Sequence, residues 1–232
     1  MKGTNKLNAR RRLLSRSALA ALGATALTLG VSGHVSAAPL VATQSYFAGY
    51  AEAPTDGIAS ASATFKVPAI SCSDDNDYAQ QLGVNVDNSL YAAIEAGCNG
   101  SGSASYNFFL EEGGGTPFTP TGVSAGDTVV TVVFQTTSTQ EADVEDLTTG
   151  ARWYDYGPNT GTLSDAFIGG FNVGDTPPFG TVSFTKCQIN GLYLDAESPT
   201  QYNQKIGGTT LVTASAIGKP GDTFKLTFKH EA

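Results

Sequence analysis

The sequence predicts an all-β protein built from two packed antiparallel sheets or a flattened barrel. Short runs of alternating or β-branched residues recur from Ser45 onward. Clusters of Gly, Pro, Asn and Asp separate these runs and supply turn chemistry, as in Pro54–Gly57 and Lys219–Asp222. No amphipathic helical run of useful length interrupts them, and many short strands at regular spacing are typical of a sandwich or barrel.

Twelve strands are expected, each from alternation or from enrichment in β-branched residues. In chain order they are Ser45–Ala53, Ile58–Val67, Ala79–Val86, Leu90–Ala96, Ser105–Glu111, Thr128–Thr137, Glu141–Leu147, Ala151–Tyr156, Asp165–Asn172, Gly180–Gln188, Thr209–Ser215 and Thr223–His230. The chain has no internal repeat and no low-complexity linker, so these strands are assigned to one domain, residues 45–232.

Residues 1–37 have the features of a signal peptide. Six Lys and Arg residues form a basic start, Ala18–Val31 is an apolar stretch too short to span a bilayer, and Val35–Ala37 resembles a small-residue cleavage site. The mature protein is therefore expected to be secreted, with a disordered N-terminal stretch at residues 38–44. Arg10–Arg12 also has the outline of a twin-arginine signal, so the export route stays open.

Loss of the signal peptide makes the mature chain strongly acidic. Seven Lys and Arg remain against 21 Asp and Glu, a net charge of about −14. Nucleic acid and anionic membrane surfaces are poor partners for such a chain. No later apolar run is long enough to cross a bilayer, and a monomer is expected.

The mature chain keeps one histidine, His230, close to the C-terminus. This count argues against Ser-His-Asp and Cys-His mechanisms and against a His-built zinc site, so a hydrolase would depend on carboxylates or amides. Neither a cofactor nor a metal is expected. Asp74, Asp75 and Asp77 offer oxygen ligands for calcium, but a solvated acidic loop is the commoner explanation of such a cluster.

Three cysteines remain after cleavage: Cys72, Cys98 and Cys187. Export to an oxidising compartment favours pairing two of them. We expect a disulfide between Cys72 and Cys98, with Cys187 left as a free, buried thiol.

The most informative stretch is Leu82–Glu111, where carboxylates lie among apolar and aromatic residues of adjacent predicted strands. Successive strand residues point to opposite faces. Two sets of three therefore share a face, Tyr91, Ala93 and Glu95 on one strand and Asn107, Phe109 and Glu111 on the next. If both sets line one groove, Glu95 and Glu111 offer general acid or base chemistry or an acidic binding cleft. The alternative is an ordinary solvated face.

Seven ordered stretches of the mature chain match the pattern of a known family. They are Ala63–Pro68, Gly83–Asp87, Ala93–Gly97, Tyr106–Glu111, Gly126–Val129, Val144–Gly150 and Phe179–Thr185. In this order they resemble the glutamic peptidases, or eqolisins. The resemblance implies a lectin-like antiparallel β-sandwich of two packed, curved sheets, one of which forms the substrate cleft.

The resemblance also implies a chemistry, in which a glutamate acts as general base on water and a glutamine stabilises the oxyanion. This sequence departs from the pattern at both positions. Glu95 stands in the place of the glutamine, and Gly169 in the place of the glutamate. Asn107 and Phe109 replace an aspartate and a tryptophan of the cleft.

Three functions follow from these departures. The first is a secreted protein that binds extended peptide or polysaccharide in an acidic cleft, with catalysis lost or altered. The second is an acid endopeptidase in which Glu95 and Glu111 share a proton, or in which Asp165, on the same predicted face as Gly169, supplies a base. The third is a purely structural secreted or surface protein.

One further motif stays open. Trp153 and Tyr154 offer an aromatic platform for sugars, although a Trp in a strand more often faces the core.

Overall fold

The computed structural model describes residues 41–73, 78–87, 89–99, 101–112, 122–172, 176–196 and 198–230. The signal peptide expected at residues 1–37 lies outside the described residues. The regular secondary structure of the described residues is β-strand, apart from one 3₁₀ turn, η2, at Leu194–Ala196. The strands are β1 Val41–Gln44, β2 Phe47–Glu52, β3 Ser60–Lys66, β4 Tyr78–Val86, β5 Leu90–Cys98, β6 Ala104–Glu112, β7 Thr128–Gln135, β8 Thr139–Asp146, β9 Arg152–Pro158, β10 Ala166–Asn172, β11 Thr181–Ile189, β12 Leu192–Tyr193, β13 Thr200–Ile206, β14 Thr209–Ala214 and β15 Phe224–Phe228.

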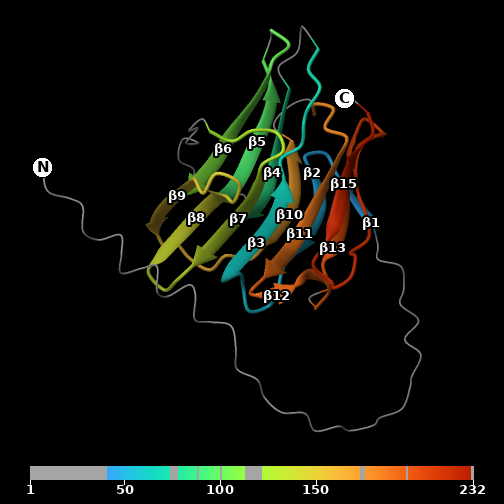
Figure 1. The fold of residues 1–232 in the computed structure, drawn as a ribbon. Helices are drawn as coiled ribbons and strands as arrows, with labels where there is room; N and C mark the ends of the chain where they lie inside the picture. Colours follow the sequence, from blue (N-terminus) through green and yellow to red (C-terminus); the bar gives the residue numbers. More distant parts are fainter. Residues whose placement is uncertain are drawn as a thin grey trace, which may run out of the picture. The chain divides into compact units, whose positions relative to one another are not determined.

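The strands form one long sheet that folds back on itself into two layers (Figure 1). Their order is β6-β5-β4-β10-β2-β13-β14-β15-β11-β3-β7-β8-β9. Neighbours on this path are antiparallel, and β1 adds a parallel pair with β13. Strands β4, β5 and β6 pack against β3, β7, β8 and β9, which makes the two layers of a sandwich. The predicted all-β antiparallel sandwich is therefore confirmed.

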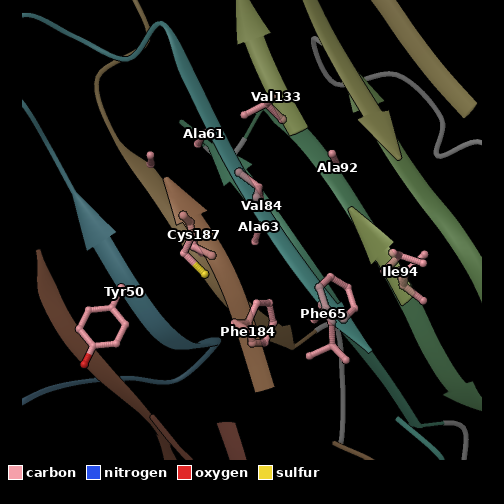
Figure 2. Close-up of a cluster of buried hydrophobic side chains, with 14 of the residues drawn as sticks. Tyr50, Ala61, Ala63, Phe65, Val84, Ala92, Ile94, Val133, Phe184 and Cys187 are labelled. Carbon is pink, nitrogen blue, oxygen red and sulfur yellow. The ribbon is translucent and has the colours of Figure 1, made fainter. Parts of the chain in front are cut away.

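The core lies between the two layers (Figure 2). Alternation places one face of each strand inward, as in β7, where every second residue from Val129 to Val133 is buried. Phe184 is fully buried and stacks on Phe224 with ring centroids 4.9 Å apart. Trp153 of β9 stacks on Phe108 of β6 with ring centroids 4.0 Å apart. This contact joins the two layers at the strands that begin and end the strand order.

All twelve predicted strands are present, with ends shifted by a few residues. Three strands escaped prediction: β1, β12 and β13. Residues 41–44 were expected to be disordered, but they form β1 beside β13. Strand β13 lacks the usual alternation because it buries glutamines: Gln201 donates to the Ala214 carbonyl at 2.6 Å, and Gln204 donates to the Ser45 carbonyl at 3.3 Å.

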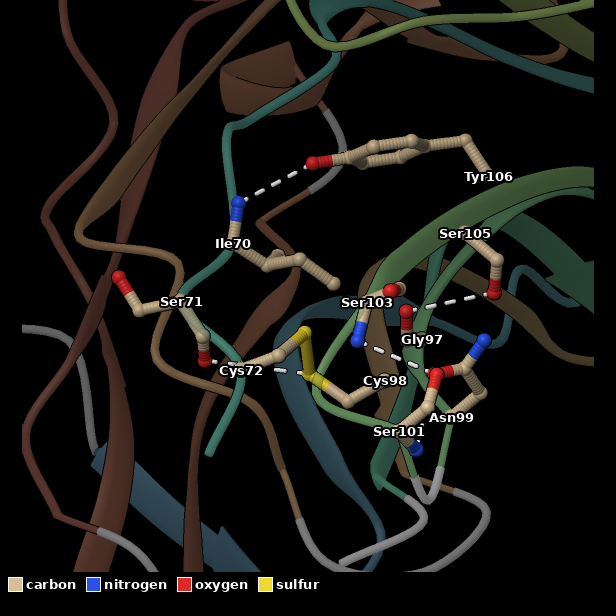
Figure 3. Close-up of a disulfide and its surroundings, with 10 residues drawn as sticks. All are labelled: Ile70, Ser71, Cys72, Gly97, Cys98, Asn99, Ser101, Ser103, Ser105 and Tyr106. Atoms are coloured by element: carbon tan, nitrogen blue, oxygen red, sulfur yellow. Dashed lines mark hydrogen bonds between the residues drawn. A yellow bond between two sulfur atoms is a disulfide. The ribbon is translucent and has the colours of Figure 1, made fainter. Parts of the chain in front are cut away.

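Cys72 and Cys98 form a disulfide, as predicted (Figure 3). It ties the segment after β3 to the end of β5 across a sequence separation of 26 residues, which stabilises the fold by about 3.5 kcal/mol in the chain-entropy model. Nearby, the backbone N–H of Ile70 donates to the Tyr106 hydroxyl at 3.1 Å. Cys187 is free and buried, also as predicted, and burial raises the pKa of its thiol.

Within the described part of the chain, we find no helix with the length and apolar character needed to cross a membrane.

Candidate ligand-binding face

Strands β2, β10, β4, β5 and β6 lie side by side, and their register aligns side chains in rows across the sheet. Cross-strand partners share a face of the sheet. One row runs Phe47, Phe171, Gln81, Glu95 and Asn107. The next row, two residues along each strand, runs Gly49, Gly169, Gly83, Ala93 and Phe109. Both rows lie on the face opposite the core, which we call the aromatic face.

The middle of the aromatic face has almost no side chains. We call Gly49, Gly169, Gly83 and Ala93 the glycine row. The three glycines have φ of 145°, 156° and 155°, a region that favours glycine. A Cβ on Gly169 would overlap the carbonyl oxygen of Ala48 and lie 2.9 Å from the Cα of Gly49. A Cβ on Gly83 would likewise overlap the Ala92 carbonyl. The backbone therefore requires glycine at these positions.

Aromatic rings surround the glycine row. Phe47 stacks on Phe171 at 5.1 Å and meets Phe167 edge-on at 5.4 Å. Tyr91 meets Phe109 at 5.6 Å and Phe171 at 6.0 Å. Phe47, Phe109 and Phe171 are buried, yet they lie outside the cluster of core residues between the layers. They form a second apolar group, in which Phe47 also contacts Phe167 and Tyr202.

A polar pair lies beside the rings. Gln81, which is buried, donates from Nε2 to Oε2 of the half-buried Glu95 at 3.3 Å. Asn107 is the backbone partner of Glu95 on the next strand. The row thus combines a carboxylate acceptor with two side-chain amides.

Asp87 directly follows β4 and connects the end of β4 to the start of β10 through hydrogen bonds. It accepts hydrogen bonds from the backbone N–H groups of Ser164 at 2.9 Å and Asp165 at 2.8 Å. The Ser164 hydroxyl donates to Asp87 at 2.8 Å and lies 3.4 Å from the Asp165 carboxylate. Asp165 is four residues from Gly169, which is roughly 13 Å along a strand. It therefore lies at the edge of the aromatic face.

The register also fixes the backbone positions of the two predicted glutamates. Glu95 pairs with Asn107, whereas Glu111 pairs with Tyr91. The two Cα positions are thus offset by four residues, roughly 13 Å along the strands. The side chain of Glu111 lies outside the described part of the structure.

The sequence matches the model of the peptidase A4 family over residues 45–223, most of the chain. This chain belongs to the peptidase A4 family. No curated protein sequence matches it. Among solved structures it resembles scytalido-glutamic peptidase with a transition state analog inhibitor, at 20% identity and a TM-score of 0.61, with 80% of this chain and 99% of that chain covered. It also resembles SCP-B, an eqolisin in complex with the tripeptide Ala-Ile-His, at 20% identity, a TM-score of 0.60 and the same coverage. These likenesses concern the fold.

Within this peptidase A4 fold, several residues of the aromatic face were missed from the sequence. Gln81 was not singled out, nor were Phe47, Phe167 and Phe171. Alternation along the Asp165–Asn172 strand places Phe167 and Phe171 on the same face as Gly169. The signal was therefore present in the chain. Gln81 could not be recognised without the strand register, because only the pairing of β4 with β5 brings it next to Glu95.

The predicted calcium ligands Asp74, Asp75 and Asp77 lie outside the described residues. In the ranges that the structure does describe, no group of three or more His, Cys, Asp or Glu is arranged to hold a metal ion. Trp153 faces the core rather than a ligand, and its neighbour Tyr154 is exposed.

Proposed function

We propose that this peptidase A4 family member binds an extended peptide on its aromatic face and does not hydrolyse it. The glycine row carries this proposal. A general base and an oxyanion donor must both reach the same reacting atoms. Positions in one row of β10 and β5 are separated by two strand spacings, about 10 Å, with β4 between them. Side chains of glutamate and glutamine length can meet across that gap.

In this chain that row holds Gly169, Gly83 and Ala93. The position across from Gly169 on β5 is therefore Ala93, and Glu95 is two residues further along. Neither Gly169 nor Ala93 has a carboxylate or an amide. The backbone at Gly169 also leaves no room for a Cβ. A glutamate could therefore not be placed at this position unless the surrounding backbone moved.

The same face suits a peptide. Its rings offer apolar contacts, and Gln81, Glu95 and Asn107 offer donors and acceptors for a peptide backbone. The tripeptide bound to SCP-B supports a peptide as the ligand class. We also propose that the chain is secreted after removal of residues 1–37, because a disulfide is stable in an oxidising compartment.

The test has two parts. Purified protein is incubated with a denatured protein substrate from about pH 2 to neutral, and binding of a library of fluorescent octapeptides is measured by anisotropy. We expect no cleavage, and saturable binding that Phe171→Ala weakens about tenfold, or about 1.4 kcal/mol. Tyr193→Ala, which removes an exposed ring from β12, is the control and leaves binding unchanged. Absence of peptide binding by the folded protein contradicts the proposal.

A second candidate rests on the contact between Gln81 and Glu95. A carboxylate and an amide at 3.3 Å are the two group types that the chemistry of a glutamic peptidase uses, so Glu95 would act as the base and Gln81 as the oxyanion donor. Cleavage in acid that Glu95→Gln abolishes and Gln81→Ala lowers by roughly 10²–10³ would establish this activity. Glu111→Ala in the same assay tests the alternative pair of Glu95 and Glu111.

A further inference from the structure

A pair of exposed tyrosines lies on the outer face of β9. Tyr154 and Tyr156 are 58% and 64% exposed, the two largest values among the exposed large hydrophobic residues of the described chain. Their ring centroids are 6.1 Å apart and the ring planes differ by 24°. Trp153, the residue before Tyr154, packs on Phe108 on the other side of the strand. The strand that carries the two rings is therefore anchored to the core.

The neighbouring strand, β8, places carboxylates beside the rings. The register places Asp143 opposite Tyr154, Glu141 opposite Tyr156 and Glu145 opposite Arg152. Arg152 donates from Nε to both Asp143 oxygens at 2.9 and 2.8 Å, and its guanidinium lies 6.0 Å from the centre of the Tyr154 ring.

The charge of Arg152 is already balanced within this group. The hydrogen bond to Asp143 raises the pKa of the guanidinium, and Glu141 lies 3.9 Å from it. Three carboxylates therefore face one cation on β8 and β9. A surface of this sign repels an anionic ligand.

We propose that Tyr154 and Tyr156 form a binding platform for a neutral polysaccharide. The face of a tyrosine ring is electron-rich, and the axial C–H bonds of a sugar ring are weakly positive, so a sugar stacks on it much as an aromatic edge does. Two near-parallel rings on one strand suit consecutive sugars of an extended chain. The carboxylates beside the rings accept hydrogen bonds from sugar hydroxyls, and such bonds to charged acceptors are the stronger kind.

A second copy of this chain fits the same surface less well. A two-fold interface brings each patch against itself. Glu141, Asp143 and Glu145 of one copy would then meet the same carboxylates of the other, and like charges brought together disfavour association. A neutral glycan meets no such repulsion.

The experiment measures binding to three insoluble neutral glycans, cellulose, chitin and a β-1,3-glucan, and to their soluble hexasaccharides by calorimetry. We expect binding to at least one, with a loss of tenfold or more in Tyr154→Ala and in Tyr156→Ala. Tyr154→Phe keeps the ring and is expected to stay within about threefold of the parent. Tyr193→Ala controls for loss of an exposed tyrosine elsewhere. Phe171→Ala changes the aromatic face and leaves both tyrosines in place, so it shows whether the glycan binds at the aromatic face instead.

Three results would overturn the platform. One is no binding to any of the three glycans by folded protein. Another is binding that the double variant Tyr154→Ala, Tyr156→Ala leaves unchanged. The third is a concentration-dependent dimer, seen by light scattering, that the double variant converts to monomer, since the rings would then serve self-association.

Discussion

The two faces of the sheet formed by β2, β10, β4, β5 and β6 bury apolar residues in different ways. On the core face, Leu82, Ile94 and Ile168 are fully buried beneath the opposite layer. On the aromatic face, Phe47, Phe109 and Phe171 are buried among aromatic rings around the glycine row. The core face follows the usual logic of a sandwich, whereas the aromatic face places apolar surface where an antiparallel sheet normally meets water. This difference favours a ligand on the aromatic face.

The largest expected effect compares one ring from each face. Phe108→Ala should cost about 3–5 kcal/mol of unfolding free energy, because Phe108 is fully buried between the layers and stacks on Trp153. Phe171→Ala should cost roughly half as much, since Phe171 lies outside the core cluster and the neighbouring rings can move into the space, so that a closed cavity need not form. Urea denaturation of both variants measures the difference. Equal losses would mean that the aromatic face is part of the core energetically.

The glycine row gives the next prediction. Gly169→Ala should cost roughly 3 kcal/mol, from backbone strain together with overlap on the Ala48 carbonyl. Gly150 also has positive φ, at 76°, but a Cβ there would meet nothing within 4 Å. Gly150→Ala is therefore the matched control and should cost about 1–2 kcal/mol, from strain alone. Thermal or urea unfolding decides, and similar costs would show that strands β2 and β10 can separate to admit a side chain.

Much of the fold could be predicted because alternation is a local signal. Twelve strands and the Cys72–Cys98 pair followed from the residues themselves and from the expected compartment. Strand β13 could not be found this way, because Gln201 and Gln204 are buried through hydrogen bonds to distant carbonyls instead of through apolar side chains.

The candidate site was predicted less well, for a reason that concerns register. Alternation showed which residues of one strand share a face, as for Tyr91, Ala93 and Glu95. It could not show which residues of different strands stand in one row. Strand β10 lies between β4 and β2 although some 80 residues separate it from β4 in the chain, and only this pairing brings Gly169 level with Ala93.

The smallest expected effect concerns a residue on the core face of β2. Tyr50 donates from its hydroxyl to the Ser215 carbonyl at 2.7 Å and lies 3.1 Å from Gln201 Oε1. Burial raises the pKa of Tyr50 to about 12, from about 10 in the unfolded chain. The folded state thus holds this proton more tightly, so its contribution to stability is complete below pH 10 and is lost as the pH rises through 12.

At pH 11 the loss should be about 1.4 kcal/mol, because the unfolded chain has released the proton and the folded protein has not. Tyr50→Phe removes this titration, and its unfolding free energy should fall less between pH 9 and pH 11 than that of the parent. Tyr202→Phe, on the aromatic face beside Phe47, keeps Tyr50 and should behave like the parent. A parallel fall in all three proteins would mean that the alkaline loss comes from general charge repulsion in an acidic chain rather than from the buried hydroxyl of the core face.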